Sequence, residues 1–206
     1  MKKGTEPLLE PVALKALRPT QITVGMREVE IKRKAWRKRS TRKDEKYLGR
    51  HMMPTVLGPK GHHYIVDHHH LALALHREGV EEVLVQTISN LSGLDASAFW
   101  SVMDARDWVH PYDDEGRRRG FKDIPKSIET MLDDPFRSLA GELRRVGGFA
   151  KETQPFAEFL WADHMRRRMK RALVEKDFSH ALEKALAFAR APDASYLPGW
   201  CGPDPD

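Results

Sequence analysis

The sequence contains almost no cysteine, no long hydrophobic run and no internal repeat. Its single cysteine, Cys201, excludes an intrachain disulfide framework and a zinc site built from cysteines. No stretch approaches the ~18 apolar residues of a membrane-spanning helix, and the starting residues MKKGTEPLLEP lack the apolar segment of a signal peptide. We therefore expect a cytoplasmic protein without a membrane partner and without redox chemistry based on paired thiols.

The charge of the chain is concentrated in one segment. The 206 residues carry a formal net charge of +5, with 40% hydrophobic residues, which is typical of a soluble globular protein. Residues 26 to 50 hold eleven lysines and arginines against four acidic residues, so this window alone carries +7. Such a run is usually a solvated helix face, but with Trp36 and Tyr47 among the cations it also fits contact with a nucleic-acid backbone. The candidate contacts are Lys32, Arg33, Arg37 and Lys38.

Histidine is clustered as well. Seven of the ten histidines lie between His51 and His76, and three of them follow one another directly after Asp67. Histidine has only moderate helix propensity, so three at a helix start are unexpected on packing grounds alone. This concentration is the strongest compositional sign of a functional site.

The first 92 residues show patterns of mixed strands and helices. Residues 12 to 24 are typical of extended chain around Pro19, and 26 to about 46 predict a charged helix. Two β-prone runs, 55–57 and 63–66, flank the turn residues 58–61 and predict a hairpin. A helix follows Asp67 or His68 as its N-cap, and a strand is expected at 82–88.

The second half is predicted to be helical, with helices at 95–107, 127–132, 134–146, 154–174 and 179–189. The fold class is therefore α+β, with a small mixed β-sheet in an α+β domain of residues 1–92. A helical subdomain with a Pro/Gly-rich tail occupies 93–206, and the aromatic residues of that tail indicate that it packs back onto the body.

The histidine run stands between a predicted strand and a predicted helix. A helix amino terminus presents unpaired backbone N–H groups and the positive end of the helix dipole, so phosphate groups bind there readily. Asp67 at the same junction is suited to holding a metal ion or accepting a proton. The alternative is that Asp67 is only the N-cap of the helix, with a stabilisation of about 1 kcal/mol.

The order of these segments resembles a known family. The run LRPTQITVGMREVE, the basic helix, His51, the run MPTVLGPKGHHYIVDHHHLALAL and a following strand resemble the ParB-like nuclease domain of the ParB/sulfiredoxin superfamily, in particular its stand-alone ParB-like nucleases. The segments DDPFRSLAGELRR and FAEFLWADHMR look like the helical continuation of that group. The resemblance implies that an Asp-Gly-His-His-Arg-like box at the strand-to-helix turn holds nucleotide phosphates, and that an upstream glutamate acts as a base in kinase members.

Carried over by position, the resemblance assigns Asp67 to the aspartate of the box, and His69 and His70 to its histidines. Glu28 or Glu30 corresponds to the upstream acid. His68 replaces the glycine of the box, and Leu71 stands in place of its arginine. The usual guanidinium contact to phosphate is therefore missing, and another cation has to supply the charge, for which Lys60, Arg27 and Arg77 are the candidates.

Three functions remain open from the sequence. The first is a ParB-like nuclease or nucleotide-binding protein in which Asp67 and Glu28 or Glu30 act as acids, and His68, His69, His70 and Lys60 contact phosphate. Its expected cofactors are a nucleotide, ATP or CTP, with Mg²⁺ or Mn²⁺, and Asp67 with His69 is the candidate metal pair. The second is a non-enzymatic DNA-binding protein, and the third is a nucleotide-dependent amino-acid kinase. Sulfinic-acid reduction is excluded because the box has no cysteine.

Overall fold

The structure is a computed structural model that describes residues 9–40 and 51–203. Contacts divide the chain into two compact units. Unit 1 holds the described residues up to Ile22, those of Val29–Pro111, and Arg119–Met131. Unit 2 holds Thr23–Glu28, Tyr112–Arg118 and the described residues from Leu132 onward. In the parts of the chain that the structure describes, no helix has the length and apolar character needed to cross a bilayer.

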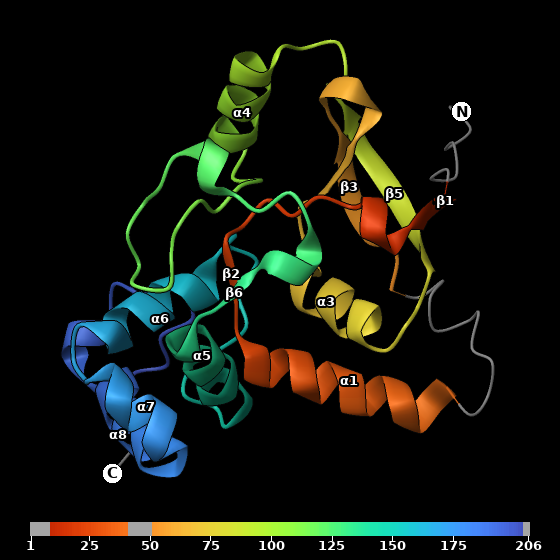
Figure 1. Ribbon diagram of the computed structural model, residues 1–206. Coiled ribbons are helices and arrows are strands. Elements are labelled where there is room, and N and C mark those ends of the chain that lie inside the picture. The colour runs from red at the N-terminus through yellow and green to blue at the C-terminus, as the bar shows by residue number, and fades with distance from the viewer. Residues whose placement is uncertain (1–8, 41–50, 204–206) are drawn as a thin grey trace, which may run out of the picture. The chain divides into compact units, whose positions relative to one another are not determined.

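Unit 1 is built on a four-stranded mixed sheet in the order β1-β5-β3-β4 (Figure 1). β1 (Leu9–Ala13) is antiparallel to β5 (Glu82–Asn90), which is parallel to β3 (Met53–Leu57), which is antiparallel to β4 (His63–Ile65). The parallel pair β3 and β5 needs a crossover, and helix α3 (His69–Arg77) lies in it. The α+β class and the mixed sheet are thus as predicted.

The predicted hairpin of β3 and β4 is confirmed, with Leu57 opposite His63. Its connection contains a short 3₁₀ turn, η2 (Pro59–Gly61), in which the N–H of Gly61 donates to the carbonyl of Gly58 at 3.1 Å. Lys60 has a φ of 61°, which is the left-handed conformation required after proline in this kind of turn. The lysine side chain is thereby held at the exposed tip of the hairpin.

The remaining elements of unit 1 are one further long helix, part of α1, and short 3₁₀ turns. α4 (Ala96–Ala105) begins at Asp95, whose carboxylate accepts the N–H of Ala98 at 2.9 Å as an N-cap. The turns are η1 (Leu14–Ala16), η3 (Phe121–Asp123) and η4 (Ile128–Thr130). A core cluster joins the sheet to α4 and the later loops through buried apolar residues: Ile22, Val56, Tyr64, Phe99, Met103, Val109 and Ile124.

Helix α1 (Met26–Ser40) is described as far as Ser40, and the rest of the predicted helix, to about residue 46, lies outside the described residues. Its first three residues cluster with unit 2 and those from Val29 onward with unit 1. The domain division expected between residues 92 and 93 stays a prediction, since these units are defined by contacts, which place α4 with the sheet.

Unit 2 is mainly helical. It contains α5 (Pro135–Arg145), α6 (Ala157–Arg166), α7 (Arg171–Lys176), α8 (Phe178–Arg190) and η5 (Pro192–Ala194). The core of this unit includes Trp161, whose ring stacks on Phe149 at 4.5 Å between centroids and whose Nε1–H donates to the carbonyl of Pro198 at 2.8 Å. The carboxyl-terminal segment therefore packs onto its unit as expected.

Two of the predicted helices were wrong. The helix expected at 154–174 is two helices, because Lys170 adopts an extended backbone, and the break lets Val174 of α7 pack in the core of unit 2. The helix expected at 127–132 is only the turn η4, followed by β6 (Leu132–Asp133). β6 pairs in parallel with β2 (Thr23–Val24), a partner more than 100 residues away that no local pattern reveals.

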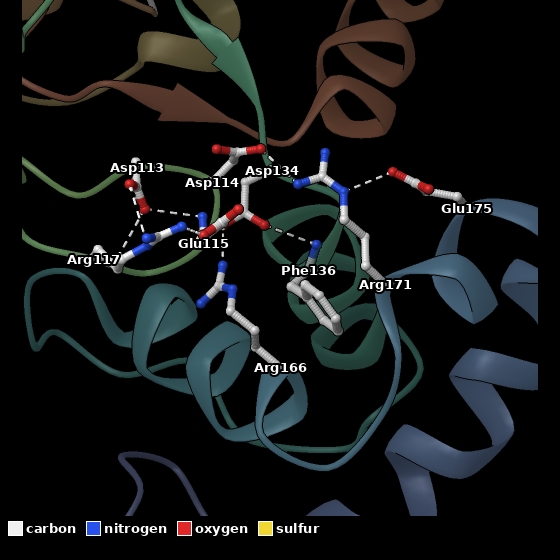
Figure 2. Close-up of polar contacts among 9 residues, drawn as sticks. All are labelled: Asp113, Asp114, Glu115, Arg117, Asp134, Phe136, Arg166, Arg171 and Glu175. Carbon is white, nitrogen blue, oxygen red and sulfur yellow. Dashed lines mark hydrogen bonds and ion pairs between the residues drawn. The ribbon is translucent and has the colours of Figure 1, made fainter.

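A network of ion pairs stabilises the acidic loop of unit 2 (Figure 2). Asp113 accepts the backbone N–H groups of Glu115 and Arg117 at 3.0 and 2.9 Å, so it shapes the loop. Asp114 pairs with Arg171 at 2.5 Å, and Arg171 also pairs with Glu175 at 2.7 Å. The carboxylates of Asp113 and Asp114 thus have structural partners in this loop.

Candidate functional site

The candidate site is the junction between β4 and α3 in unit 1. The chain leaves β4 at Ile65, and α3 begins at His69 with His68 as its N-cap residue. Among the described residues, no side chain forms an N-cap hydrogen bond to this helix. The carboxylate of Asp67 instead accepts the N–H of His68 itself, at 2.6 Å. The first turn of α3 thus keeps the property that favours anions, which is a set of N–H groups without a side-chain cap.

His68 has a backbone conformation that glycine favours. Its φ is 66° and its ψ is 22°, in the left-handed region. A non-glycine residue there has an unfavourable contact between its Cβ and the backbone, with a cost of about 1–2 kcal/mol. The resemblance assigned this position to the glycine of the phosphate box, and the structure gives the physical reason why a glycine suits it. Histidine is among the residues that tolerate this region better than most, and it adds an imidazole.

The imidazole of His68 lies among charged groups. Burial lowers the pKa of His68 below its usual 6.5. The carboxylate of Asp67 opposes this shift, whereas Lys32 and His51 lower the pKa further. Lys32 comes from α1 and His51 from the segment before β3, so three elements place positive or protonatable groups near one helix amino terminus. A bound anion would relieve the repulsion between them.

His69 has a structural partner. Its side chain is buried, with 3% exposure, and its Nε2 accepts the backbone N–H of Thr20 at 3.1 Å. An acceptor nitrogen holds no proton, so neutral His69 carries its proton on Nδ1. Burial lowers the pKa of His69 to about 3. His70 is also buried, whereas the side chain of Asp67 is 73% exposed.

The predicted upstream acids lie in different contact environments. Glu30 in unit 1 pairs with Arg33 at 2.7 Å and with Arg77 at 3.6 Å. Glu28 in unit 2 pairs with Arg137 at 3.3 Å. Arg77, a candidate phosphate contact, thus already forms an ion pair with Glu30 in unit 1. The role of either glutamate as a second catalytic acid stays a prediction.

The predicted cations are distributed over unit 1. Lys32 reaches the junction, whereas Lys60 lies at the hairpin tip, where it acts on His62. Arg33 and Arg37 both donate to the carboxylate of Glu78 at 2.7 Å. Lys38 is exposed on α1. Of the four residues proposed for nucleic-acid contact, Arg33 and Arg37 thus already form ion pairs with a carboxylate of the same chain.

The residues at the junction do not fit a metal ion held by Asp67 and His69 together. The Nε2 lone pair of His69 accepts the Thr20 amide, and the ring also forms a hydrogen bond with the backbone of Ile65. Within the described ranges, no group of three or more His, Cys, Asp or Glu side chains is arranged to hold a metal ion. The exposed Asp67 carboxylate remains free to contact a cation that arrives with a nucleotide.

The sequence pattern contained two residues whose importance was not assigned. Thr20 lies in the run LRPTQITVGMREVE, and its amide fixes His69. His51 belongs to the histidine cluster and affects His68. Their positions in the motif were the only available signal, because neither partner is close in sequence.

Comparison with known proteins identifies a matching family and a similar solved structure. Residues 10–167 match the family described as "Putative ParB-like nuclease". The crystal structure of protein Atu1540 from Agrobacterium tumefaciens has 51% sequence identity and a TM-score of 0.90, over 97% of this chain and 99% of that one. No curated protein matches the chain. Because the family match spans most of the sequence and includes both the histidine junction and the helices α5 and α6, the chain belongs to the ParB-like nuclease family.

Proposed function

We propose that the amino end of α3 binds a phosphate group of a nucleotide or nucleic acid, as the first step of phosphoester hydrolysis. The observation that carries this proposal is the left-handed backbone of His68 at a helix start without a side-chain cap. His68 is strained in this conformation, whereas a glycine at the same position would not be. Backbone strain of this kind is concentrated at functional sites.

The charge around His68 supports the same ligand class. Lys32 and His51 act on His68, and the helix dipole adds a partial positive charge at the same end of α3. In this proposal, these groups together supply the positive charge of the box arginine. Buried Leu71 stands in its place and carries no charge. Amino-acid kinase activity is disfavoured, because Leu71 is buried at the position where the resemblance places the phosphate-binding arginine.

Asp67 is the proposed reactive acid. Its exposed carboxylate stands one residue from His68 and has room for a water molecule or a hydrated Mg²⁺ or Mn²⁺ ion. In the proposed hydrolysis, Asp67 accepts a proton from the attacking water, the water oxygen bonds to phosphorus, and the phosphorus bond to the leaving oxygen breaks. The leaving oxygen takes up a proton from solvent.

The test uses His68→Gly and Asp67→Asn in the full chain. We would measure thermal shifts and calorimetric affinity for ATP, CTP and a short single-stranded DNA, each with and without Mg²⁺ or Mn²⁺. His68→Gly relieves the backbone strain and removes the imidazole, so the unfolding temperature should stay equal or rise while phosphate affinity falls several-fold. Asp67→Asn should retain phosphate binding and lose hydrolysis.

Two results would contradict the proposal. One is an unchanged affinity in His68→Gly, and the other is the absence of any shift with all of these ligands. Lys151→Gln in unit 2 provides the matched control for general loss of positive charge, because Lys151 is exposed and far along the chain from the junction.

We also propose DNA binding by α1 as a second function, on the basis of the basic run at residues 26–50. Glu78 bears on this proposal, because its carboxylate already neutralises Arg33 and Arg37. A DNA phosphate has to compete with Glu78 for these two guanidinium groups, whereas Lys38 is exposed to it directly.

A further inference from the structure

Unit 1 contains a pocket that none of the junction residues lines. Its volume is about 140 Å³. Aromatic and cationic side chains form most of its wall: Arg18, Tyr64, Trp100, Phe121, Lys122 and Lys126. These residues come from the segment before β2, from β4, from α4 and from the loop around η3.

The aromatic part of the wall is fixed by its own packing. Trp100 stacks on Phe121, with ring centroids 5.5 Å apart and planes 10° from parallel. Tyr64 meets Trp100 edge-on, with 5.5 Å between centroids and 84° between planes. Tyr64 is only 8% exposed and belongs to the core of unit 1, so it holds Trp100 from the protein side. A planar ring is the ligand group that stacked and edge-on aromatic side chains favour.

Of the three cations in the wall, Arg18 is held by a neighbouring side chain, and the two lysines have no such partner among the described residues. The guanidinium of Arg18 donates to Nε2 of His62 at 2.8 Å. Burial, together with the charges of Arg18 and Lys60, lowers the pKa of His62, so this histidine stays a neutral acceptor and holds Arg18 in place. Lys122 and Lys126 are exposed, and within the described part of the chain neither has a hydrogen bond or an ion pair. Three cations facing one aromatic pocket without a paired carboxylate favour a negatively charged ligand.

We propose that this pocket binds a small aromatic anion, which is one planar ring bearing a carboxylate or a phosphate. A cavity of about 150 Å³ is known to accommodate benzene, so a pocket of this size takes a single ring. The ring lies against Trp100, and the anionic group lies at the rim beside Lys122 and Lys126. This site is separate from the phosphate site proposed at His68 and does not depend on it.

The chemistry of the ligand has two natural sources, an aryl carboxylate and a ring-bearing phosphate such as a pyrimidine nucleotide. Calorimetric titration with benzoate, phenyl phosphate and uridine 5′-monophosphate distinguishes them by which anion binds more tightly. Cyclohexanecarboxylate tests whether the ring must be aromatic, and benzyl alcohol tests whether the charge is needed. Inorganic phosphate tests whether the anion alone is sufficient.

Variants separate the contributions of the ring and the charge. Trp100→Leu should weaken binding of the aromatic anions about three- to tenfold, whereas Trp100→Phe, which keeps a ring, should retain most of the affinity. Lys122→Gln and Lys126→Gln should each weaken binding about two- to fivefold at low salt, with no effect on benzyl alcohol. Lys15→Gln is the control, since Lys15 is exposed in the same unit and does not line the pocket.

The proposal is overturned if no aromatic anion binds, if cyclohexanecarboxylate binds as tightly as benzoate, or if Lys15→Gln weakens binding as much as the pocket lysines. If Trp100→Leu does not fold, the exposed lysine variants still decide the result. His68→Gly serves as a cross-check, because it should leave benzoate affinity unchanged whether or not it affects nucleotide binding.

Discussion

Nε2 of His69 accepts the backbone N–H of Thr20 at 3.1 Å, across 49 residues of sequence. This bond joins the first turn of α3 to the segment before β2 inside the core of unit 1. The hydroxyl of Thr20 also donates to the carbonyl of Ile65 at 2.9 Å, at the end of β4. The neighbouring histidines therefore differ in role. His69 fixes the junction through its bond to Thr20, whereas the side chain of His68 is partly accessible to solvent.

The buried His69 predicts that the protein loses stability in acid. Its pKa is about 3 in the folded chain, against 6.5 in the unfolded chain, so only the unfolded chain takes up this proton between those values. The contribution to stability is therefore complete above pH 6.5 and falls as the pH drops from 6.5 towards 3, by up to about 1.4 kcal/mol per pH unit. Urea unfolding at several pH values measures this slope.

A matched pair of variants assigns the slope to His69. His69→Gln retains an acceptor for the Thr20 amide but does not titrate, so its stability should change less with pH between 6 and 4. His180→Gln is the control, because His180 is half-exposed at the surface of α8. A His69→Gln protein with the full wild-type slope would show that other groups cause the acid sensitivity.

Local sequence patterns predicted the helices, strands and turns that are determined by residues close together in the sequence. The turn Gly58–Pro59–Lys60–Gly61 and its flanking β-prone runs specify the hairpin, and the strand expected at 82–88 is found at Glu82–Asn90. The start of α5 at Pro135, with Asp134 as N-cap, also follows from its residues. In each case the residues that determine the structure are within a few positions of each other.

The features that the sequence did not predict depend on distant partners. The pairing of β2 with β6 joins residues 23–24 to 132–133. The environment of His69 depends on Thr20, and the pocket of unit 1 combines Arg18 with Trp100 and Lys126. A single sequence without its fold contains no signal that brings these residues together. The motif therefore identified a candidate site along the chain but did not distinguish the fully buried His69 from the partly buried His68.

Glu78 offers a way to test DNA binding by α1. Its carboxylate accepts hydrogen bonds from Arg33 and Arg37, which lower its pKa. If α1 contacts DNA, Glu78→Gln should release both guanidinium groups and raise the affinity for non-specific duplex DNA. The salt dependence should also become steeper, by about one unit for each additional phosphate contact. Fluorescence anisotropy at several salt concentrations measures both quantities.

Neutralising the cations of α1 should have the opposite effect. Substitution of Lys32, Arg33, Arg37 and Lys38 by glutamine should flatten the salt dependence, whereas Asp67→Asn should leave it unchanged. DNA affinity that responds to neither Glu78→Gln nor the fourfold substitution would exclude α1 as the contact surface.

The ion pair of Asp134 and Arg166 should dominate the polar contribution to the stability of unit 2 (Figure 2). Asp134 is 1% exposed, caps α5 through the N–H of Phe136, and lies 2.6 Å from the guanidinium of Arg166. Asp134→Ala leaves the arginine partly buried without this partner, so we expect a loss of about 3–5 kcal/mol. Chemical denaturation monitored by tryptophan fluorescence measures it.

Two comparisons separate the ion pair from the helix cap. Asp134→Asn keeps an acceptor for the Phe136 amide and should cost less than the alanine variant. Asp95→Ala removes an exposed cap of α4 and should cost only about 1 kcal/mol. Equal losses in Asp134→Ala and Asp95→Ala would mean that the cap, and not Arg166, accounts for the effect.

Gly58 should be intolerant of even a methyl group, because a Cβ at this position would lie 2.5 Å from the ring of Tyr64 and 2.8 Å from the ring of Phe99. These two rings belong to the core of unit 1, with centroids 4.7 Å apart, so they have little room to move. Gly58→Ala should therefore lower the free energy of unfolding by about 1–3 kcal/mol through overpacking. Displacement of Tyr64 would also disturb the wall of the aromatic pocket, so benzoate affinity should fall in the same variant.

Gly93→Ala, where a Cβ has no heavy atom within 4 Å, should change stability by less than about 0.5 kcal/mol and leave the pocket unaffected. A Gly58→Ala protein as stable as Gly93→Ala would show that the two rings move apart freely, and it would remove the support that Tyr64 is argued to give Trp100.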